Sequence, residues 1–294
     1  MMVKVLVTGT SSFGVGEGLL KTIQMSCFRE QIKLLGASNS ELTAYKQLVD
    51  KYYVLPNAVN DLYLQKLNDI IEKENVDIII PGSEAEVSVL ARNRGYFRKV
   101  DLWMNDTDIA AVFNDKKTAH QFFLKNNLPT PKVYEDDMSV KFPAIVKPVD
   151  GKSSEGIYIT HNKNQLDCVE YTVSVINTSG YELEVFIMKR ILSKGATQYA
   201  VVEMDDRILE IAKRVHEYMQ NELIINIQLM KKDGRYYIIE INPRFSGSSP
   251  IRALMGFNEF DVLFSQKFMK QKFKYTIKEG YYCIRGYAEF LYHI

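Results

Sequence analysis

The sequence predicts an α/β protein in which a doubly wound parallel sheet is followed by two α+β regions. Three observations support this prediction. Short apolar strands alternate with amphipathic helices over the first third of the chain, strands follow one another from about residue 140, and the segment KKDGR at 231–235 joins two strands like a hairpin turn. Alternating strand and helix implies parallel strands with right-handed crossovers, whereas a short turn implies antiparallel strands.

The parallel sheet is expected to begin close to the N-terminus. Segments 3–9 (VKVLVTG) and 33–39 (KLLGASN) are rich in strand-forming residues, and segment 16–27 between them has the apolar spacing of a helix. Segment 61–76 is an amphipathic helix with its leucines and isoleucines mainly on one stripe, and it leads into the apolar strand 77–84 (DIIIPGSE). This βαβαβ order is typical of a doubly wound sheet.

The later elements complete three expected domains. A helix over 114–128 takes Asn114 or Asp115 as its N-cap. The later strands are expected at 142–149, 156–160, 169–176, 181–191, 196–203, 223–230 and 236–242, with one helix at 206–219. The domains then span 1–112 for the parallel sheet, 113–187 for a small subdomain with a glycine- and serine-rich loop, and 188–294 for a C-terminal subdomain.

The composition indicates an ordinary globular protein. The 294 residues are 46% hydrophobic and 25% charged, and the net charge of +1 gives no indication of a nucleic-acid or membrane surface. Cys27, Cys168 and Cys283 form no CxxC or Cys/His pattern, which predicts reduced thiols in a cytoplasmic protein. The N-terminal segment is interpreted as a first strand rather than a signal peptide.

The last predicted hairpin carries polar side chains that could bind a metal ion. Glu240 and Asn242 lie two positions apart, so they share one face of their strand, and Gln228 lies on the partner strand. A carboxylate and two amide oxygens are ligands that suit Mg²⁺, with other positions left for water and phosphate. The alternative is a hairpin with one polar, solvated face.

The length of the turn decides whether Gln228 joins Glu240. An odd loop, either three residues (233–235) or five (232–236), places the two side chains opposite one another. A two-residue Asp-Gly turn is favoured locally, but it pairs Gln228 with Ile239 unless a β-bulge restores the face. We expect the odd register.

The apolar residues of the hairpin are the reason for that expectation. The residues that must share the opposite, buried face are Ile225, Ile227, Leu229, Ile239 and Ile241.

A second polar segment follows the predicted strand 142–149. Lys147 ends an apolar run, and the small-residue turn 151–156 (GKSSEG) comes directly after it. Backbone N–H groups in such a loop can lie along phosphate oxygens, and a lysine can add a point charge. The alternative is a mobile hairpin loop with an exposed lysine, and the spacing is not that of a Walker loop.

Four short motifs now occur in one order: Lys116 at the start of a helix, IVKP with its Gly/Ser loop, NIQ at 226–228, and EINPR at 240–244. With the ending NPRFSGSS at 242–249, they resemble the ATP-grasp superfamily, and within it the carbamoyl-phosphate-synthase-like proteins. The resemblance covers nearly the whole chain. It implies a pre-ATP-grasp domain followed by the two α+β subdomains of an ATP-grasp fold.

The resemblance also implies a role for individual residues. ATP would lie between two antiparallel sheets with Mg²⁺ or Mn²⁺ held by Gln228, Glu240 and Asn242. Arg244 would meet the carboxylate or acyl phosphate being formed, and Lys147 is implied in the same catalytic step. The nucleotide-binding residues implied are Lys116, Lys147, Gly151, Lys152, Ser153, Ser154, Gly156, Arg190 and Met230. For Arg190 the alternative is a solvated strand end.

The activity implied is ATP-dependent carboxylate ligation. A carboxylate attacks the γ-phosphate, and an amine or another nucleophile then displaces phosphate from the acyl phosphate. This chemistry needs positioning and charge neutralisation, which suits a set of cations, metal ligands and backbone donors. The resemblance implies small carboxylate and amine substrates without nucleic acid or membrane as partner, and it leaves a homodimer open.

One segment departs from the family pattern. In relatives the equivalent of 156–160 is followed by a helix and then by a strand that leads to a linker touching the adenine, whereas here the segment is about twenty or more residues shorter. The residues that would contact adenine are therefore not assigned. A different strand such as 181–187 takes that role, or the nucleotide site is incomplete, or the natural protein has residues that this sequence lacks.

Two further motifs have both a structural and a functional interpretation. The glycine-rich segment TGTSSFGVGEG at 8–18 lacks the G-x-G-x-x-G spacing, so we expect a tight strand-to-helix turn, with a surface facing the acceptor substrate as the family alternative. The segment GSEAE at 82–86 is a capping box or part of a substrate site. His120, His161, His216 and His293 form no cluster and receive no role.

Three classes of function therefore remain at this stage. The first is an ATP-dependent carboxylate ligase, which the three metal-ligand candidates and both lysines favour. The second is a nucleotide-binding protein without ligase activity, which the shortened middle favours. The third is a nicotinamide-dependent oxidoreductase, which only the N-terminal fold favours.

Overall fold

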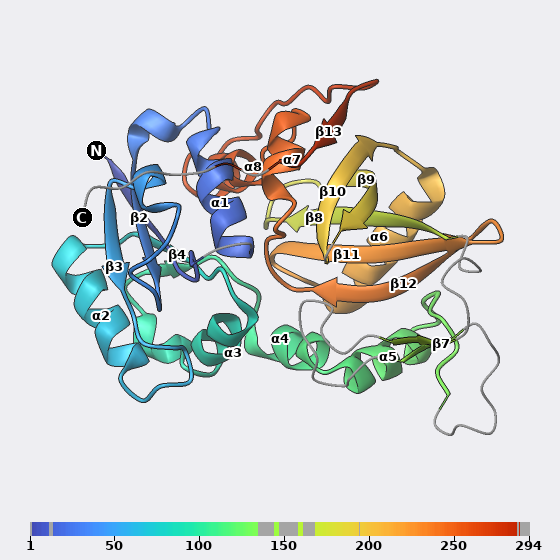
Figure 1. Cartoon of the computed structure of the whole chain (residues 1–294), viewed down its shortest axis with the longest axis horizontal. Helices are drawn as coiled ribbons and strands as arrows, with labels where there is room; N and C mark the ends of the chain where they lie inside the picture. The colour runs from blue at the N-terminus through green and yellow to red at the C-terminus, as the bar shows by residue number, and fades with distance from the viewer. Residues whose placement is uncertain are drawn as a thin grey trace.

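A computed structural model describes residues 2–11, 14–134, 144–146, 158–160, 168–193, 195–286 and 288. It shows two principal sheets lying side by side, with helices α7 (Ser249–Leu254) and α8 (Glu259–Lys267) between them (Figure 1). The predicted helix 114–128, Lys116 included, lies within the described residues. The proposed phosphate loop at 151–156 and Lys147 lie outside them. Within the described residues, no helix is long and apolar enough to cross a membrane.

The first sheet has five parallel strands in the order β3-β2-β1-β4-β5, which confirms the doubly wound prediction. Its strands and helices are β1 (Val3–Val7), α1 (Val15–Gln24), β2 (Ile32–Ser38), β3 (Lys51–Val54), α2 (Tyr63–Glu74), β4 (Ile78–Ile80), α3 (Glu84–Arg92) and β5 (Asp101–Leu102). Short 3₁₀ turns occur at Arg29–Gln31, Lys46–Leu48 and Arg94–Phe97. The central strands β1 and β4 are almost completely buried, as apolar strands covered on both faces should be.

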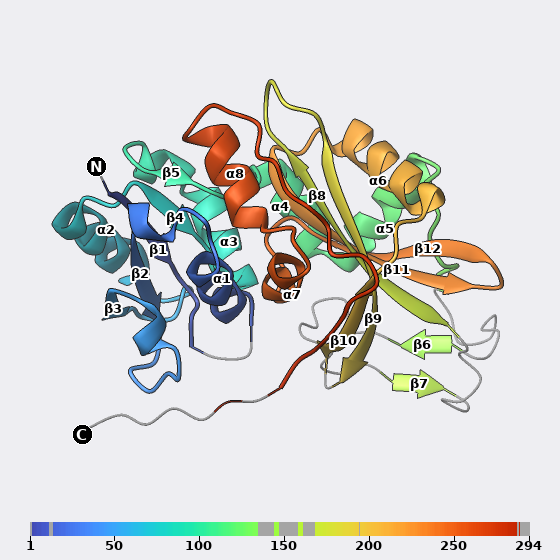
Figure 2. The same cartoon turned by 90° about the horizontal axis from the view of Figure 1, so that it is seen from above.

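Two helices then lead away from the first sheet along the lower side of the view in Figure 1. They are α4 (Thr107–Asn114) and α5 (Lys116–Lys125). Asp115 caps α5 by accepting a hydrogen bond from the Thr118 backbone N–H at 2.7 Å, so of the two predicted N-caps Asp115 is confirmed. A separate two-stranded pair, β6 (Ala144–Val146) and β7 (Tyr158–Thr160), follows (Figure 2).

The second sheet has six strands in the order β12-β11-β8-β9-β10-β13. Its elements are β8 (Val169–Asn177), β9 (Glu184–Ser193), β10 (Ala196–Val202), α6 (Asp206–Met219), β11 (Leu223–Lys232), β12 (Arg235–Asn242), α7 (Ser249–Leu254), α8 (Glu259–Lys267) and β13 (Tyr282–Ile284). All its pairings are antiparallel. The domain division expected at 187/188 falls inside β9, so strands on both sides of that division share one sheet.

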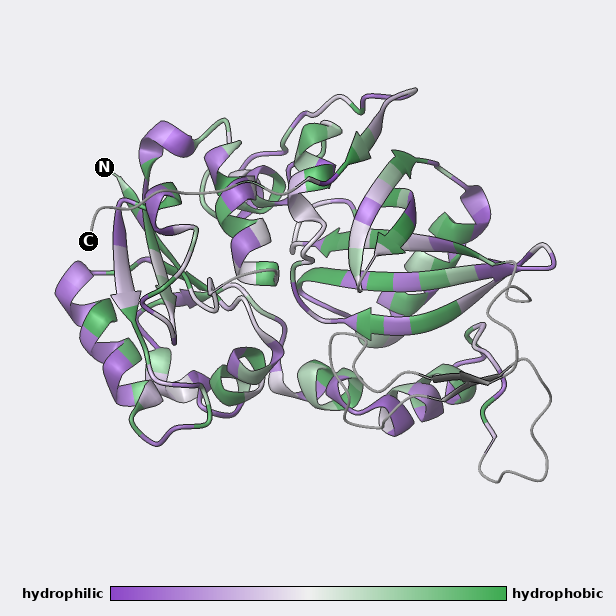
Figure 3. Cartoon of the chain, in the orientation of Figure 1, coloured by the Kyte–Doolittle hydropathy of each residue, from purple (hydrophilic) through white to green (hydrophobic). Residues whose placement is uncertain are grey.

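One face of this sheet packs on helix α6. Side chains of α6, including Ile208, Ala212 and Val215, form a core with Val173 and Ile227 on the strands. Hydrophobic and hydrophilic residues alternate along β11 and β12, as a strand with one buried face requires (Figure 3).

The opposite face of the second sheet forms part of a core that it shares with the first domain. Phe186, Met188 and Ile224 of the second sheet belong to the same buried cluster as Leu19 and Trp103 of the first domain. Polar contacts cross the same boundary: Asn258 Nδ2 donates to Thr22 O at 3.0 Å, and Asn105 Nδ2 donates to Ile224 O at 2.6 Å. The two sheets are therefore joined by a continuous core, which fixes the position of loops from one sheet against the other.

A buried carboxylate fastens the end of α2 to the first sheet. Glu74 Oε1 lies 2.5 Å from Lys51 Nζ, its Oε2 lies 3.1 Å from Lys33 Nζ, and the Tyr53 hydroxyl also donates to it. These contacts, with that of Lys51 the strongest, lower the pKa of Glu74 from 4.5 to about 2. The ionised carboxylate is therefore the form that stabilises the fold.

We expect Glu74→Gln to lower the melting temperature at neutral pH, because the amide cannot attract the two lysines. The pKa of Glu74 is lower in the folded than in the unfolded chain, so the stabilisation is complete above about pH 4.5 and is lost as the pH falls towards 2. The difference between variant and wild type, followed by circular dichroism, should shrink over that range. The exposed Glu72 on the same helix supplies a control, Glu72→Gln, and an equal effect of both changes would contradict the assignment.

Candidate functional site

The apolar face shared by the two domains becomes polar towards one end of the second sheet. Along β9, Arg190 follows Phe186 and Met188 on this face, and along β11 Gln228 follows Ile224 on it. Glu240 lies on the neighbouring strand β12 and Glu170 on β8. Four adjacent strands therefore bring one cation, two carboxylates and an amide to a single surface.

Gln228 and Glu240 are direct partners across the β11–β12 hairpin. Asn242 pairs with Asn226 two positions further along, so it lies on the same face. The structure thus brings together the three side chains predicted to hold a metal ion. The predicted turn, however, was wrong in its length.

The turn has two residues rather than three or five. Lys232 pairs with Arg235, which leaves Asp233 and Gly234 as the loop. Their φ angles of 49° and 75° are the left-handed values that a type I′ turn requires. The locally favoured Asp-Gly turn is therefore the one that forms.

A β-bulge restores the register that this turn would otherwise shift. Gln228 pairs with Glu240 but the next residue, Leu229, pairs with Ile238, so Ile239 is the extra residue on β12. The expectation that Ile239 shares the buried face was wrong, because Ile238 is fully buried there and Ile239 is only partly buried. The backbone N–H of Ile238 donates to Pro129 O at 2.7 Å, which supports the bulged edge from the loop after α5.

Arg190 reaches across the sheet to the predicted metal ligands. Its Nη2 donates to Gln228 Oε1 at 3.0 Å, and its Nε lies 3.5 Å from Glu170 Oε2. Burial lowers the pKa of Arg190, with Glu170 acting in the opposite direction. The alternative of a solvated strand end is therefore wrong, since only 9% of Arg190 is exposed.

Arg244 connects the same site to the first domain. Its Nη2 donates to Asn242 Oδ1 at 3.0 Å and to Glu84 Oε1 at 2.6 Å, and its Nη1 donates to Phe245 O at 3.0 Å. Its Nε is buried and has no hydrogen-bond partner among the described residues. Glu84, on α3, therefore fixes the direction of the Arg244 guanidinium beside Asn242.

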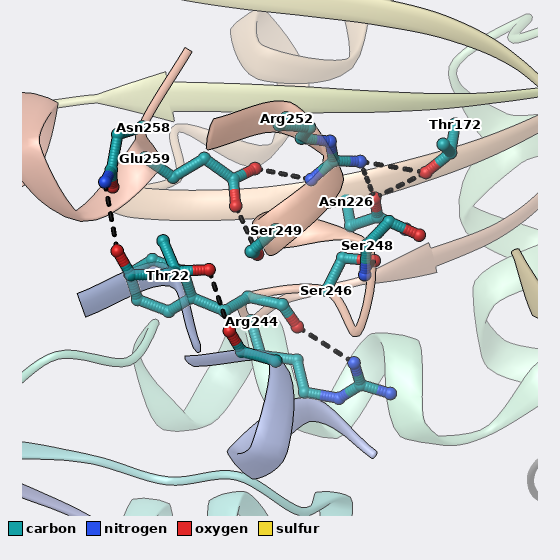
Figure 4. Close-up of polar contacts among 12 residues, drawn as sticks. Thr22, Thr172, Asn226, Arg244, Ser246, Ser248, Ser249, Arg252, Asn258 and Glu259 are labelled. Carbon is teal, nitrogen blue, oxygen red and sulfur yellow. Dashed lines mark hydrogen bonds and ion pairs between the residues drawn. The ribbon is translucent and has the colours of Figure 1, made fainter. Parts of the chain in front are cut away.

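A fully buried ion pair lies beneath this surface. Arg252 of α7 pairs with Glu259 of α8, and both side chains are inaccessible to solvent. The Arg252 Nη2 group also donates to Thr172 Oγ1 at 2.9 Å and to Asn226 Oδ1 at 2.5 Å (Figure 4). Because Asn226 precedes Gln228 by two residues on one face, the pair anchors β11 directly beside the site.

The other predicted site residues are placed as follows. Lys116 is the first residue of α5, and Met230 lies on β11 opposite Tyr237, on the same face as Gln228. The predicted contacts of Lys147, Gly151, Lys152, Ser153, Ser154 and Gly156 lie outside the described residues.

The glycine-rich turn after β1 is a close backbone contact. A Cβ on Gly16 would lie 2.4 Å from Gly9 O, and one on Gly82 would lie 2.2 Å from Thr8 O. This packing fits the tight strand-to-helix turn expected there. Ser83 caps α3 by accepting from the Glu86 N–H, so the capping interpretation of 82–86 is confirmed, while the adjacent Glu84 turns to Arg244.

The donor set fits a divalent cation bound with phosphate. Both amide groups turn their oxygen, rather than their nitrogen, towards a positively charged group, as they would towards a metal ion. Among the described residues no three His, Cys, Asp or Glu side chains form a metal-binding group. A metal held here would therefore depend on amide and phosphate oxygens as well as on Glu240.

Sequence reasoning missed several residues of the site. Glu170 and Thr172 lie two positions apart in VEYTVSVI, and this period of two would have placed both on one face of their strand, which in the structure is the face of Arg190. No pattern in the sequence indicates the Glu84–Arg244 and Arg252–Glu259 contacts. Glu84 and Arg244 are far apart in the chain, whereas Arg252 and Glu259 have the spacing and composition of ordinary polar positions on helices.

Comparisons with known proteins find similarity over most of this chain. A family model described as "ATP-grasp in the biosynthetic pathway with Ter operon" matches residues 163–280, and one described as "PylC-like, N-terminal domain" matches residues 11–104. The carbamoyl phosphate synthase large chain of Clostridium botulinum (strain Kyoto / Type A2) is 22% identical over 298 residues, covering 84% of this chain. The chain is similar to carbamoyl-phosphate-synthase-like ATP-grasp proteins.

Solved structures share the fold of this chain. The biotin carboxylase domain of 2-oxoglutarate carboxylase from Hydrogenobacter thermophilus superposes with a TM-score of 0.73 at 13% identity, covering 96% of this chain and 73% of that one. N5-carboxyaminoimidazole synthetase from Staphylococcus aureus gives a TM-score of 0.70 at 14% identity, covering 95% and 81%. The chain spans only 27% of the length of the carbamoyl phosphate synthase relative.

We expect Gly234→Ala to lower the free energy of unfolding by about 1 kcal/mol, because an alanine at a φ of +75° is strained. Urea denaturation measures this difference. Gly95→Ala is the matched control, since the space around that glycine is open and its φ is not left-handed. Equal stability of the Gly234→Ala variant and wild type would contradict the type I′ turn, and with it the need for a bulge.

Proposed function

We propose that this ATP-grasp protein is an ATP-dependent carboxylate ligase that forms an acyl phosphate captured by an amine or a similar nucleophile. The observation that carries the proposal is the alignment of Gln228, Glu240 and Asn242 on one face of the hairpin, with Arg244 directly beside Asn242. This places candidate metal ligands next to a cation.

The proposed binding mode uses this chain's own groups in two sets. Gln228, Glu240 and Asn242 would hold Mg²⁺ or Mn²⁺, which would neutralise the triphosphate and polarise its γ-phosphate. Lys116, Lys147 and the loop 151–156 would bind the phosphates, and Met230 would line the nucleotide on the sheet side. Arg190 would add a second cation at the phosphates.

The acceptor side of the proposed reaction centres on Arg244. Its side chain is 14% exposed, and a substrate carboxylate or the acyl phosphate would accept hydrogen bonds from the accessible part of the guanidinium. Glu84 holds the same guanidinium at 2.6 Å, which keeps it in one direction. The carboxylate then attacks the γ-phosphate, ADP leaves, and the nucleophile displaces phosphate from the acyl group.

The neighbours support this assignment by what their titles print. The biotin carboxylase domain was solved with MgADP and bicarbonate and is described as a dimer, and the Staphylococcus aureus synthetase was solved with ADP. For this chain we propose the same classes of ligand: ATP with a divalent metal, a small carboxylate and an amine. Cys27 and Cys283, which form no disulfide in the part of the chain that is described, support a reducing, cytoplasmic location, and a homodimer remains part of the proposal.

We expect Glu240→Gln to reduce Mg²⁺-dependent ATP turnover by at least about a hundredfold, because it removes the only full negative charge among the three proposed ligands. Release of ADP and phosphate, measured with a panel of amino acids as carboxylates and amines, provides the assay. The fold should remain intact, since Glu240 is only partly buried.

Glu210→Gln, at an exposed position of α6, is the control for loss of a carboxylate elsewhere. A fluorescent ATP analogue, titrated with and without Mg²⁺, separates nucleotide binding from turnover. Turnover by Glu240→Gln within a few-fold of wild type would remove the basis for the metal site. Binding of the analogue without turnover on any substrate would favour a nucleotide-binding protein that is not a ligase.

A further inference from the structure

The amide oxygen of Gln228 already has a cationic partner in this structure. Arg190 Nη2 donates to Gln228 Oε1 at 3.0 Å, and the same guanidinium lies 3.5 Å from Glu170 Oε2. Arg190 Nη1 also lies 3.5 Å from Thr197 Oγ1, which exchanges a hydrogen bond of 2.8 Å with Ser248 Oγ. Arg190 therefore lies within the proposed metal site rather than beside it.

The pairing of the strands explains why Arg190 reaches this position. Arg190 pairs with Glu170 across β9 and β8, while the neighbouring Thr172 of β8 pairs with Gln228 of β11. The arginine side chain is long enough to pass diagonally over β8 to the next strand. Glu240 then lies opposite Gln228, so the guanidinium faces both carboxylates of the surface.

A guanidinium and a divalent cation compete for one amide oxygen. A metal bound to Gln228 Oε1 would lie about 2.1 Å from it, so two positive charges would lie within a few ångströms of each other in a poorly hydrated place. Arg190 cannot lose its proton to avoid this repulsion. Arg244 is held and neutralised by Glu84 at 2.6 Å, whereas the carboxylate partner of Arg190, Glu170, lies 3.5 Å away. Arg190 is therefore the arginine that moves, and its donors then need other acceptors.

A bound triphosphate supplies those acceptors at the same surface. Its oxygens carry more negative charge than a single amide and accept charge-assisted hydrogen bonds from arginine. The second arginine nearby does not compete for them, because Arg252 is fully buried and paired with Glu259. Among the described residues, two arginines contact a proposed metal ligand on this face. Arg244 contacts Asn242, and Arg190 contacts Gln228.

We propose that Arg190 occupies the metal position at Gln228 when no nucleotide is bound and moves to the phosphates when nucleotide binds. Free divalent cations are then excluded from the site, and the metal enters together with the nucleotide. This inference rests on the proposed function, since it assumes that Gln228 and Glu240 are metal ligands. It makes Arg190 a positioning residue for the metal rather than a simple phosphate contact.

The test measures metal and nucleotide separately in the full chain. Arg190→Met removes the charge but keeps an unbranched side chain, and it leaves Gln228, Glu240 and Glu170 free to face a cation. Mn²⁺ binding without nucleotide, followed by electron paramagnetic resonance, should become about tenfold tighter or more. Binding of the ATP analogue AMPPNP without metal should become about tenfold weaker, because a phosphate contact is lost.

Two further variants keep the test decisive. Lys189→Met changes the adjacent residue, which pairs with Glu203 at 3.9 Å, and should leave both affinities unchanged. Arg190→Lys keeps the charge and should bind Mn²⁺ as weakly as wild type. Opposite signs of the two effects cannot arise from a loosened fold, because that would weaken both affinities.

The outcomes separate this inference from the proposed function. If Arg190→Met binds Mn²⁺ within twofold of wild type while wild type binds Mn²⁺ and AMPPNP together, Arg190 does not compete for the site and the inference is wrong. If Glu240→Gln leaves Mn²⁺ binding unchanged both with and without AMPPNP, the metal site itself is wrong, and both proposals fail.

Discussion

The extra residue Ile239 in β12 is the constraint on which the site depends. The Asp233–Gly234 turn has the conformation that its residues favour, and a regular hairpin from that turn would direct Gln228 away from Glu240. The bulge changes the register after only a few residues, so the buried isoleucines stay in the core and the polar side chains meet on the other face. The bulge therefore allows the favoured turn, the packing of the core and the alignment of the polar side chains to occur in one hairpin.

The rest of the protein holds this hairpin in a defined position. Pro129 binds the backbone at Ile238, the buried Arg252–Glu259 pair binds Asn226 on β11, and Glu84 of the first domain holds Arg244. A buried ion pair contributes little net stability when compared with apolar residues, but it is specific in direction. The Arg252–Glu259 pair lies beside the site and binds β11. Together with the core that both domains share, it fixes β11 and Arg244 relative to each other.

The sequence predicted the fold well because the relevant signals are local. Strand and helix alternation gave the parallel sheet, and the Asp115 cap and the strand ranges followed from residue type and spacing. The hairpin shows the limit. Its face was predicted correctly from the metal site, but the turn length and the residue at Ile239 were wrong, because a bulge leaves no mark in the pattern of apolar residues. Contacts between distant segments could not be predicted from the sequence. Arg190 was expected near phosphates, but its partner Gln228 lies two strands away in the sheet. Strand order is a property of the folded chain, and neither propensity nor spacing determines it.

These contacts give the site its chemical character. In the structure each amide oxygen of the proposed ligand set accepts from an arginine, so the ligand oxygens are already oriented towards positive charge. Binding of a metal nucleotide would then exchange one cation for another with little rearrangement of β11 and β12. Preorganised charge of this kind is what phosphoryl transfer requires from a protein. A crystal structure of the complex with Mg²⁺ and AMPPNP tests the central claim most directly. The account predicts that Gln228 Oε1, a Glu240 carboxylate oxygen and Asn242 Oδ1 each lie about 2.0–2.2 Å from metal that also binds the phosphates. Arg190 should then contact phosphate oxygens instead of Gln228. A complex in which only phosphate and water hold the metal, with Arg190 still bonded to Gln228, would contradict it.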